Sequence, residues 1–213
     1  MLFRFSVFFL STIYIISIIS ILIDKSFLNY KNHIIPFFII INLLFLIMND
    51  ENKDKIKSKL IYFTFIFMVS YFIEVIGVNY KVIFGSYEYG NSLGIKIFST
   101  PILIGINWFF LIYLTASIYP KSINMKIPKN IKILISSLLM LAYDIVLEPV
   151  SSKLDLWYWS NNTIPIQNYI AWFVLSLLFH YIINKNNQIL TNKLSAIIYI
   201  YQIIFFLIIN MVY

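Results

Sequence analysis

Long runs of apolar residues, separated by short polar segments, make up most of the chain. A helix needs about 20 apolar residues to cross the hydrocarbon core of a bilayer, and most of these runs approach that length. We therefore predict an all-α, polytopic integral membrane protein of about seven transmembrane helices (six to eight), forming a single transmembrane domain over residues 1–213. The predicted spans are Leu2–Ile23, Ile34–Met48, Leu60–Val78, Pro101–Tyr119, Ile131–Leu147, Ile166–Ile183 and Lys193–Val212.

Details of the runs refine this prediction. The second is short enough to lie tilted or re-entrant, whereas the others are long enough to span. The first has only Arg4 before its apolar core and lacks a small-x-small cleavage site, which indicates a retained helix and not a signal peptide. Pro36, Pro101 and Pro165 each fall at a predicted helix start, where a missing N–H costs little.

The composition supports a membrane protein. Hydrophobic residues make up 61% of the 213 residues and charged residues 12%, against about 45–50% and about 25% in soluble domains. A soluble globular domain and a disordered chain are both excluded. A net charge of +7 would suggest nucleic acid as a partner of a soluble protein, but here the Lys residues lie in loops, so we expect membrane lipids and no nucleic acid as partners.

The basic residues also predict an orientation, because cytoplasmic loops are enriched in Lys and Arg. The N-terminus and the second, fourth and sixth loops carry most of the 16 basic residues. We therefore expect a cytoplasmic N-terminus, in what is best interpreted as a bacterial inner membrane. The Lys-rich side holds Arg4, Lys53, Lys55, Lys57, Lys59, Lys121, Lys126, Lys129, Lys132, Lys185 and Lys193; the other side holds Lys25, Lys31, Lys81, Lys96 and Lys153.

Two scarcities limit the chemistry. The absence of Cys excludes disulfides, iron–sulfur clusters and Cys nucleophiles. His33 and His180 are the only histidines, too few for a histidine-box oxygenase and a poor basis for a metal site. We expect no metal and no other cofactor, and interpret His33 as a loop residue and His180 as an interfacial one.

The acidic residues divide into two groups. Asp50, Glu51 and Asp54 form a Lys-laced loop that we interpret as a solvated charge run. Glu74, by contrast, lies about four residues inside the end of a predicted span, where a carboxylate is expensive and indicates function. The alternative is a Glu that reaches the headgroups or pairs with Lys81.

Asp144 and Glu148 are four residues apart and share one helix face. Because Pro149 disfavours helical geometry at the residue before it, we expect the helix to end there, with Glu148 at the membrane–water boundary and Asp144 one turn deeper. Apolar surroundings favour the neutral form of a carboxyl group, so the deeper residue can act as an acid. The alternative is a structural pair that holds the helix end.

Polar and aromatic residues gather near the same face. Tyr87 and Tyr89 lie in a Gly-rich loop, and Trp157 and Trp159 lie in a second loop, where an anchoring belt at the interface is the simpler interpretation. Asn168 and Trp172 are four residues apart, and Asn107-Trp108 lies midway along the fourth span; intramembrane Asn commonly bonds to a neighbouring helix.

Two ordered blocks of these residues resemble the membrane carotenoid hydratase family, which includes bisanhydrobacterioruberin hydratase and gamma-carotene 1'-hydroxylase. The first block is Glu74-Val-Ile-Gly77-Val, Phe84-Gly85-x-Tyr87-x-Tyr89, Leu93-Gly94-x-Lys96, Pro101 and Trp108. The second is Asp144, Leu147-Glu148-Pro149-Val150, Trp157-x-Trp159, Ile164-Pro165-x-x-Asn168-Tyr169 and Trp172. The chain departs from the expected pattern at Tyr80-Lys81, where a Thr-Gly pair is expected.

The resemblance implies an isoprenoid-modifying lyase that adds water across the terminal C1–C2 double bond of an acyclic carotenoid, giving a tertiary hydroxyl without a cofactor. Acid–base catalysis suits a chain with no Cys and few His. We expect Asp144 as proton donor, with Glu74 and Glu148 activating water or tuning the acid. The expected partners are the carotenoid within the bilayer and other carotenoid biosynthesis enzymes. The candidate substrate-binding residues are Tyr87, Tyr89, Trp108, Trp157, Trp159, Asn168 and Trp172.

Two other classes remain open from the sequence. A transporter or channel could use the carboxylates as an ion pathway, but no inverted repeat supports it. Another lipid enzyme, such as a prenyltransferase, would need Asp-rich metal motifs for a diphosphate, and the only dense acidic run is Asp50-Glu-Asn-Lys-Asp54.

Overall fold

The structure, a computed structural model, describes residues 1–51, 56–119, 126–184 and 191–213. It confirms an all-α architecture with the elements in the order expected from the apolar runs. Six of the helices are long and apolar enough to cross a membrane, and α4 is the shorter one, with 15 residues. The helices are α1 (Leu2–Ile23), α2 (Lys31–Met48), α3 (Ile56–Tyr80), α4 (Ile102–Ala116), α6 (Lys129–Ser151), α7 (Ile166–Asn184) and α8 (Ser195–Val212).

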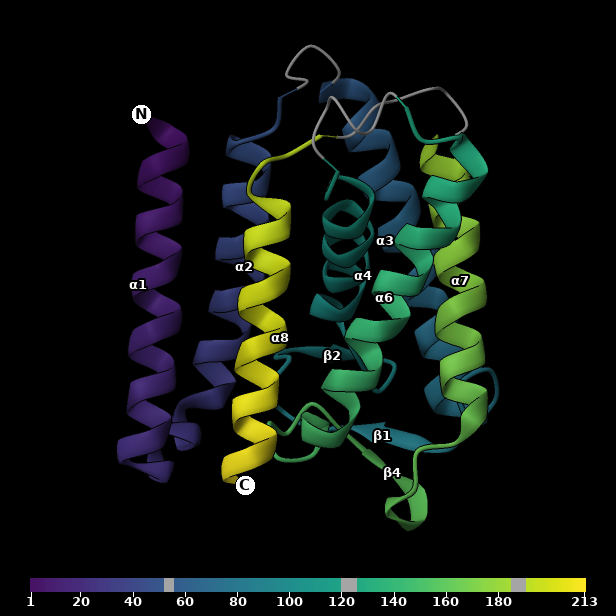
Figure 1. Ribbon diagram of the computed structural model, residues 1–213. Coiled ribbons are helices and arrows are strands. Elements are labelled where there is room, and N and C mark those ends of the chain that lie inside the picture. Colours follow the sequence, from purple (N-terminus) through teal and green to yellow (C-terminus); the bar gives the residue numbers. More distant parts are fainter. Residues whose placement is uncertain (52–55, 120–125, 185–190) are drawn as a thin grey trace.

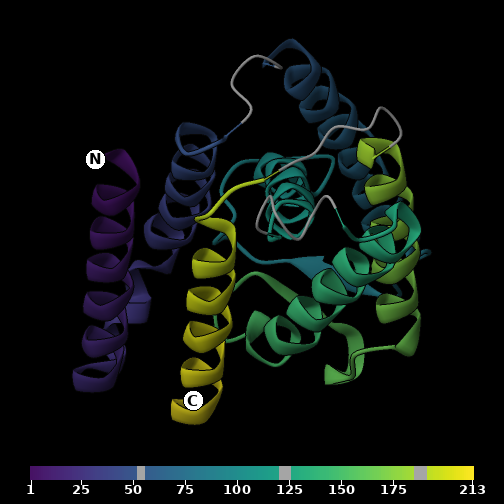
Figure 2. The same ribbon diagram turned by 45° about the horizontal axis from the view of Figure 1, so that its top comes forward.

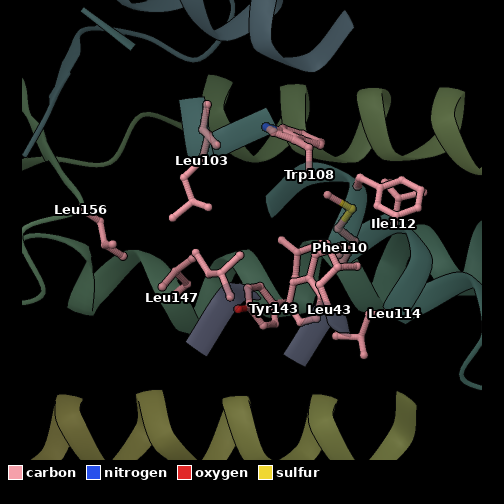
Figure 3. Packing of buried hydrophobic residues seen from close by; sticks show 14 of the residues in the cluster. Leu43, Leu103, Trp108, Phe110, Ile112, Leu114, Tyr143, Leu147 and Leu156 are labelled. Carbon is pink, nitrogen blue, oxygen red and sulfur yellow. The ribbon is translucent and has the colours of Figure 1, made fainter. Parts of the chain in front are cut away.

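Helix α4 lies at the centre of the bundle, surrounded by α2, α3, α6, α7 and α8, whereas α1 lies at the outer edge beside α8 (Figures 1 and 2). From Leu103 to Thr115 nearly every side chain of this helix is buried. Figure 3 shows its Trp108, Phe110 and Ile112 packed among side chains from neighbouring helices, Leu43 of α2 and Tyr143 of α6 included. Because its neighbours shield α4, all of its faces are apolar and it needs no polar face.

The outer faces of the bundle are also apolar. Large side chains such as Phe8 of α1, Ile61 of α3 and Ile170 of α7 are exposed on the surface of the protein. A soluble monomer rarely exposes such continuous apolar surface, whereas lipid chains accept it at no cost. The exposed faces and the buried central helix together fit a polytopic membrane protein.

The helix boundaries correct four of the sequence predictions. The second span is not short, because α2 begins at Lys31; His33 therefore lies in a helix and not in a loop, and Pro36 lies inside α2 and not at its start. The fourth span is shorter than predicted, since α4 covers only Ile102–Ala116. The polar residues Lys31-Asn-His33 concealed one helix start, and Ser117 to Tyr119 lie beyond the end of the other helix.

Helix α6 does not end at Glu148, as Pro149 led us to expect, but continues through it to Ser151. The proline removes one backbone hydrogen bond from the last turns, and the helix continues in spite of this loss. Glu148 therefore keeps a helical position one turn after Asp144, and both side chains project toward α7.

Short strands and 3-10 helices cover the end of the bundle where the C-terminus lies, opposite the N-terminus (Figure 1). Strand β1 (Tyr87–Tyr89) pairs antiparallel with β4 (Trp157–Trp159), and β2 (Lys96–Ile97) pairs with β3 (Thr100–Pro101). The 3-10 helices are η1 (Lys25–Tyr30) and η3 (Ser160–Asn162).

The turns of this cap contain several left-handed residues. Lys81, at the point where the family pattern led us to expect Gly, has φ of 58°, a conformation that Gly adopts most easily. Gly85 has φ of 115°, and a Cβ on it would lie 2.6 Å from a ring carbon of Pro165. Glycine at position 85 is thus needed for two reasons: the backbone has a positive φ, and Pro165, in the segment that leads into α7, packs directly against it.

A candidate active site built from buried carboxyl groups

A small cavity lies under the β1–β4 ribbon, between the ends of α3, α6 and α7. Its free volume of about 10 Å³ is room for about one water molecule. Two carboxyl groups that neighbouring helices contribute, Glu74 and Glu148, line this space, hereafter the carboxylate cavity. The residues around it are Glu74, Phe84, Tyr87, Tyr89, Ile104, Glu148, Trp157, Trp159, Asn168 and Trp172.

Glu74 points into the bundle and accepts three hydrogen bonds. The hydroxyls of Tyr87 and Tyr89 donate to its Oε2 at 2.5 and 2.7 Å, and Trp108 Nε1 donates to its Oε1 at 2.8 Å. Only 3% of Glu74 is exposed. Side chains two apart on a strand face the same way, so β1 brings both tyrosines to one oxygen. The expected alternatives, a Glu at the headgroups or paired with Lys81, are wrong.

The two tyrosines are fixed as hydrogen-bond donors. Burial, together with the adjacent Glu74 carboxylate, raises the pKa of Tyr87 and of Tyr89 well above the ordinary value. Ionising either phenol would bury a second negative charge beside the first. Both side chains therefore keep their protons and hold Glu74 in place.

Glu148 has a matching environment on the other side of the cavity. Trp157 and Trp159 donate their indole N–H groups to its Oε2 at 3.1 and 2.7 Å, and Asn168 Nδ2 donates to its Oε1 at 2.8 Å. With 3% exposure, Glu148 is buried inside the protein. Its position at the membrane–water boundary stays a prediction. Both tryptophans of β4 thus direct their indole N–H groups inward to a carboxyl group, so the interpretation of an anchoring belt is wrong.

Asp144 lies one helical turn from Glu148 and is fully buried. Asn168 Nδ2 also donates to Asp144 Oδ2, at 3.1 Å, so one amide of α7 connects both carboxyl groups of α6. Asp144 Oδ1 is buried and has no hydrogen-bond partner within the described part of the chain. Asp144 is therefore next to the carboxylate cavity, behind Asn168, and not in its lining.

Aromatic rings support these carboxyl groups. Trp108 and Trp172 stack with ring centroids 4.4 Å apart and planes 23° apart, which directs the Trp108 N–H toward Glu74. Tyr87 also contacts Trp159 across the ribbon, at 5.1 Å between centroids. The structure thus brings every residue proposed from the sequence as catalytic or substrate-binding into or beside one cavity.

Two lining residues were not foreseen from the sequence. Phe84 and Ile104 contribute apolar walls, and Phe84 packs so closely on Gly77 that a Cβ there would lie 2.9 Å from its ring. The only sequence signal for this contact was the glycine inside a helical run. Among the described residues, no group of three or more His, Asp or Glu side chains is arranged to hold a metal ion.

The polar residues at the other end of the bundle also correct predictions. Asp50 is buried, forms an ion pair with Lys59 at 2.6 Å and accepts a hydrogen bond from Tyr113, so it is not a solvated charge. His180 is fully buried and bonds to Thr115 Oγ1 at 2.9 Å, so it is not interfacial. Asp54, Lys53, Lys55, Lys121 and Lys185 lie outside the described residues.

The helices and the site define a polytopic α-helical membrane protein whose bundle encloses carboxyl groups at one end. The family model described as carotenoid biosynthesis protein matches residues 32–213, and the chain belongs to this family. The match begins in α2 and includes the whole site, with α1 outside it. No curated protein and no solved structure gives a significant match to this chain.

Proposed function

We propose that this protein is a cofactor-independent carotenoid hydratase. It adds water across the terminal C1–C2 double bond of an acyclic carotenoid end group and leaves a tertiary hydroxyl. Membership of the carotenoid biosynthesis family supports the substrate class. The observation that carries the proposed reaction is the unequal hydrogen bonding of the three buried carboxyl groups.

Glu74 and Glu148 each accept three hydrogen bonds from uncharged donors. Such an arrangement suits an ionised carboxylate, which can only accept. Asp144 accepts one, and its second oxygen has no partner among the residues that the structure describes. In this proposal Asp144 carries the proton, and the two glutamates carry the negative charge that stabilises a developing cation.

The proposed reaction begins when the Asp144 carboxyl group gives its proton to C2 of the alkene. The π electrons form the new C–H bond, and a tertiary cation remains at C1. A water molecule in the carboxylate cavity attacks C1 and loses a proton to Glu148 or Glu74. Return of that proton to Asp144 completes the cycle, so the net change is one water added and no electron transfer.

The aromatic side chains have a matching role. Ring faces attract a cation, and Trp157, Trp159 and Trp172 line the space where the cation would form, with Trp108 stacked on Trp172. Tyr87, Tyr89 and Asn168 hold the carboxyl groups and act as positioning residues. The small free volume limits the water that can enter, which favours one addition over side reactions of the cation.

The orientation is part of the proposal. Arg4 and Lys57 lie in the first turns of α1 and α3, and Lys126 and Lys193 shortly precede α6 and α8. These helices begin at the end of the bundle that holds the N-terminus (Figure 1). With that end in the cytoplasm of a bacterial cell, the carboxylate cavity lies in the opposite half of the inner membrane. A carotenoid whose end group reaches the carboxylate cavity would meet both water and the acid. Other carotenoid enzymes would supply this carotenoid from the bilayer.

The test is expression of the chain in a bacterium that makes a lycopene- or gamma-carotene-type pigment. Wild-type protein is expected to give a product heavier by one water, with a tertiary hydroxyl. Asp144→Asn and Glu74→Gln, which keep the side-chain shape, are expected to remove this product while the protein still accumulates in the membrane. Full hydration by both variants would overturn the proposal.

A further inference from the structure

A second, larger cavity adjoins the carboxylate cavity. We call it the α2–α8 cavity, because those helices form much of its wall. Its free volume is about 70 Å³, against about 10 Å³ for the carboxylate cavity, and both cavities share Ile104 and Trp157. From α2 come Ile34, Ile35, Phe38 and Ile39, and from α8 Gln202, Phe205 and Phe206.

The chemistry of this wall points to an uncharged, apolar ligand. Aliphatic and aromatic side chains form most of it, and Tyr143, Leu147 and Leu156, which Figure 3 shows near one another, belong to it. Its polar members are amides and phenols, such as Asn107 and Gln202, and the lining described by the structure includes no Lys, Arg, Asp or Glu. A charged headgroup would find no partner there.

The position of the α2–α8 cavity relates it to the acid. Tyr143 and Leu147 line it from α6, and each is followed in sequence by a carboxyl residue of the site, Asp144 and Glu148. Successive residues of a helix point about 100° apart, so the two pairs occupy adjoining faces. Trp157 lines both cavities and donates to Glu148. A group at the boundary of the cavities would therefore lie beside the carboxyl groups.

Helix α1 packs on the outer side of the α2–α8 cavity, where its buried Tyr14 lines the cavity and contacts Phe38 and Phe205 at 4.9 and 6.2 Å between ring centroids. Phe38 and Phe205 are half-buried and stack with centroids 6.1 Å apart and planes 19° apart. Both views of the fold show α2 beside α8 (Figures 1 and 2), and both helices are long and apolar enough to span a membrane. The cavity therefore lies among membrane-spanning helices, behind the rings of Tyr14, Phe38 and Phe205.

We propose that the α2–α8 cavity binds the branched, acyclic isoprenoid end of the substrate, while the carboxylate cavity holds the water that adds to it. This inference rests on the proposed hydration and adds the place where the hydrocarbon is held. Ile104 and Trp157 mark the boundary at which the alkene and the water meet. Ile35 and Ile34 are then specificity-determining residues, because their size sets the width of the space.

The test uses matched variants of one helix. Ile35 lines the α2–α8 cavity, whereas Ile40 is 46% exposed on the outside of α2 and does not line it. Purified Ile35→Phe and Ile40→Phe proteins in phospholipid nanodiscs are titrated with lycopene, and the induced visible circular dichroism of the bound pigment measures its affinity. Because the larger ring fills space that the isoprenoid end would occupy, Ile35→Phe is expected to lose about fivefold to 150-fold in affinity, and Ile40→Phe to stay within about twofold of wild type.

The outcomes separate this inference from the proposed function. Asp144→Asn is expected to bind lycopene like the wild type and to hydrate none of it. Equal affinities of Ile35→Phe and Ile40→Phe for lycopene would overturn the proposed binding of the isoprenoid end in the α2–α8 cavity, even where Asp144→Asn abolishes hydration. A lipid acyl chain would then be the alternative occupant. Full hydration by Asp144→Asn would overturn the proposed acid and leave the affinity test intact. Should Ile35→Phe fail to fold, Ile34→Phe tests the same wall.

Discussion

Asn168 is the residue at which the proposed mechanism is most open to refutation. Its Nδ2 donates to Asp144 at 3.1 Å and to Glu148 at 2.8 Å, so it spaces the proposed acid from the proposed base. Replacing it by Leu keeps a similar volume and removes both hydrogen bonds. The prediction is a folded, membrane-inserted protein that has lost most of its hydration activity.

The structure gives the size of this effect. A hydrogen bond to a charged group contributes about 1.5–3 kcal/mol and one to a neutral group about 0.5–1.5 kcal/mol. If Glu148 is ionised and Asp144 is neutral, Asn168→Leu removes about 2–4.5 kcal/mol of stabilisation from the paired carboxyl groups. Since about 1.4 kcal/mol corresponds to a factor of ten in rate, the expected loss of hydration rate is between about 30-fold and about 1,600-fold.

The assay is the initial rate of formation of the hydrated carotenoid by purified protein in nanodiscs, with lycopene affinity measured in parallel. The matched control is Asn184→Leu on the same helix, where the amide donates to the His180 carbonyl at 2.8 Å. This control is expected to keep its hydration rate within about threefold of wild type. If Asn168→Leu binds lycopene, melts like the wild type and hydrates at the wild-type rate, Asn168 does not organise the acid and base, and the mechanism must be abandoned.

Two further predictions concern the cap over the site. Tyr87 and Tyr89 donate to the same carboxylate oxygen. Each single change to Phe is expected to slow hydration by about tenfold, and the double change by more than the product of the two, because a buried charge then loses both donors. A double variant that is only as slow as either single variant would contradict this. A Cβ on Gly90 would overlap the backbone carbonyl of Asp155, whereas one on Gly94 would meet nothing within 4 Å. Gly90→Ala is therefore expected to abolish accumulation of folded protein. Gly94→Ala, strained only by its φ of 79°, is expected to lose about 1 kcal/mol of folding free energy, as measured by thermal unfolding in detergent. Folded Gly90→Ala protein with the melting temperature of Gly94→Ala would refute the reasoning.

The sequence predicted those features that depend on periodicity. Apolar runs of about 20 residues have few alternatives to a membrane helix, so the number and order of the helices followed directly. Helix ends were harder to predict, because they depend on packing: Pro149 would end an isolated helix, yet α6 extends past it to Ser151. The preference of a single residue for ending a helix can thus be outweighed by the packing contacts of the whole segment.

The site could be predicted only in part, and for a physical reason. Charge scarcity drew attention to Glu74, Asp144 and Glu148, since an ionisable group in an apolar run is rarely accidental. The sequence could not show that β1 and β4 pair in a register that points Tyr87, Tyr89, Trp157 and Trp159 at two different carboxyl groups. That register joins segments some 70 residues apart, and no local pattern encodes it.

The same dependence on long-range packing explains the errors at the other end of the bundle. Asp50 looked like one charge of a solvated loop, but the approach of α3 and α4 brings Lys59 and Tyr113 against it. Both ends of the protein thus bury acidic groups, but the two ends stabilise them differently. A Lys neutralises Asp50, whereas the carboxyl groups of the site receive only neutral donors from Tyr, Trp and Asn. A carboxylate neutralised by Lys can serve stability, whereas a negative charge held by neutral donors remains available to stabilise a cation. For this reason we propose the end with β1 and β4, and not the end with Asp50, as the place of the hydration reaction.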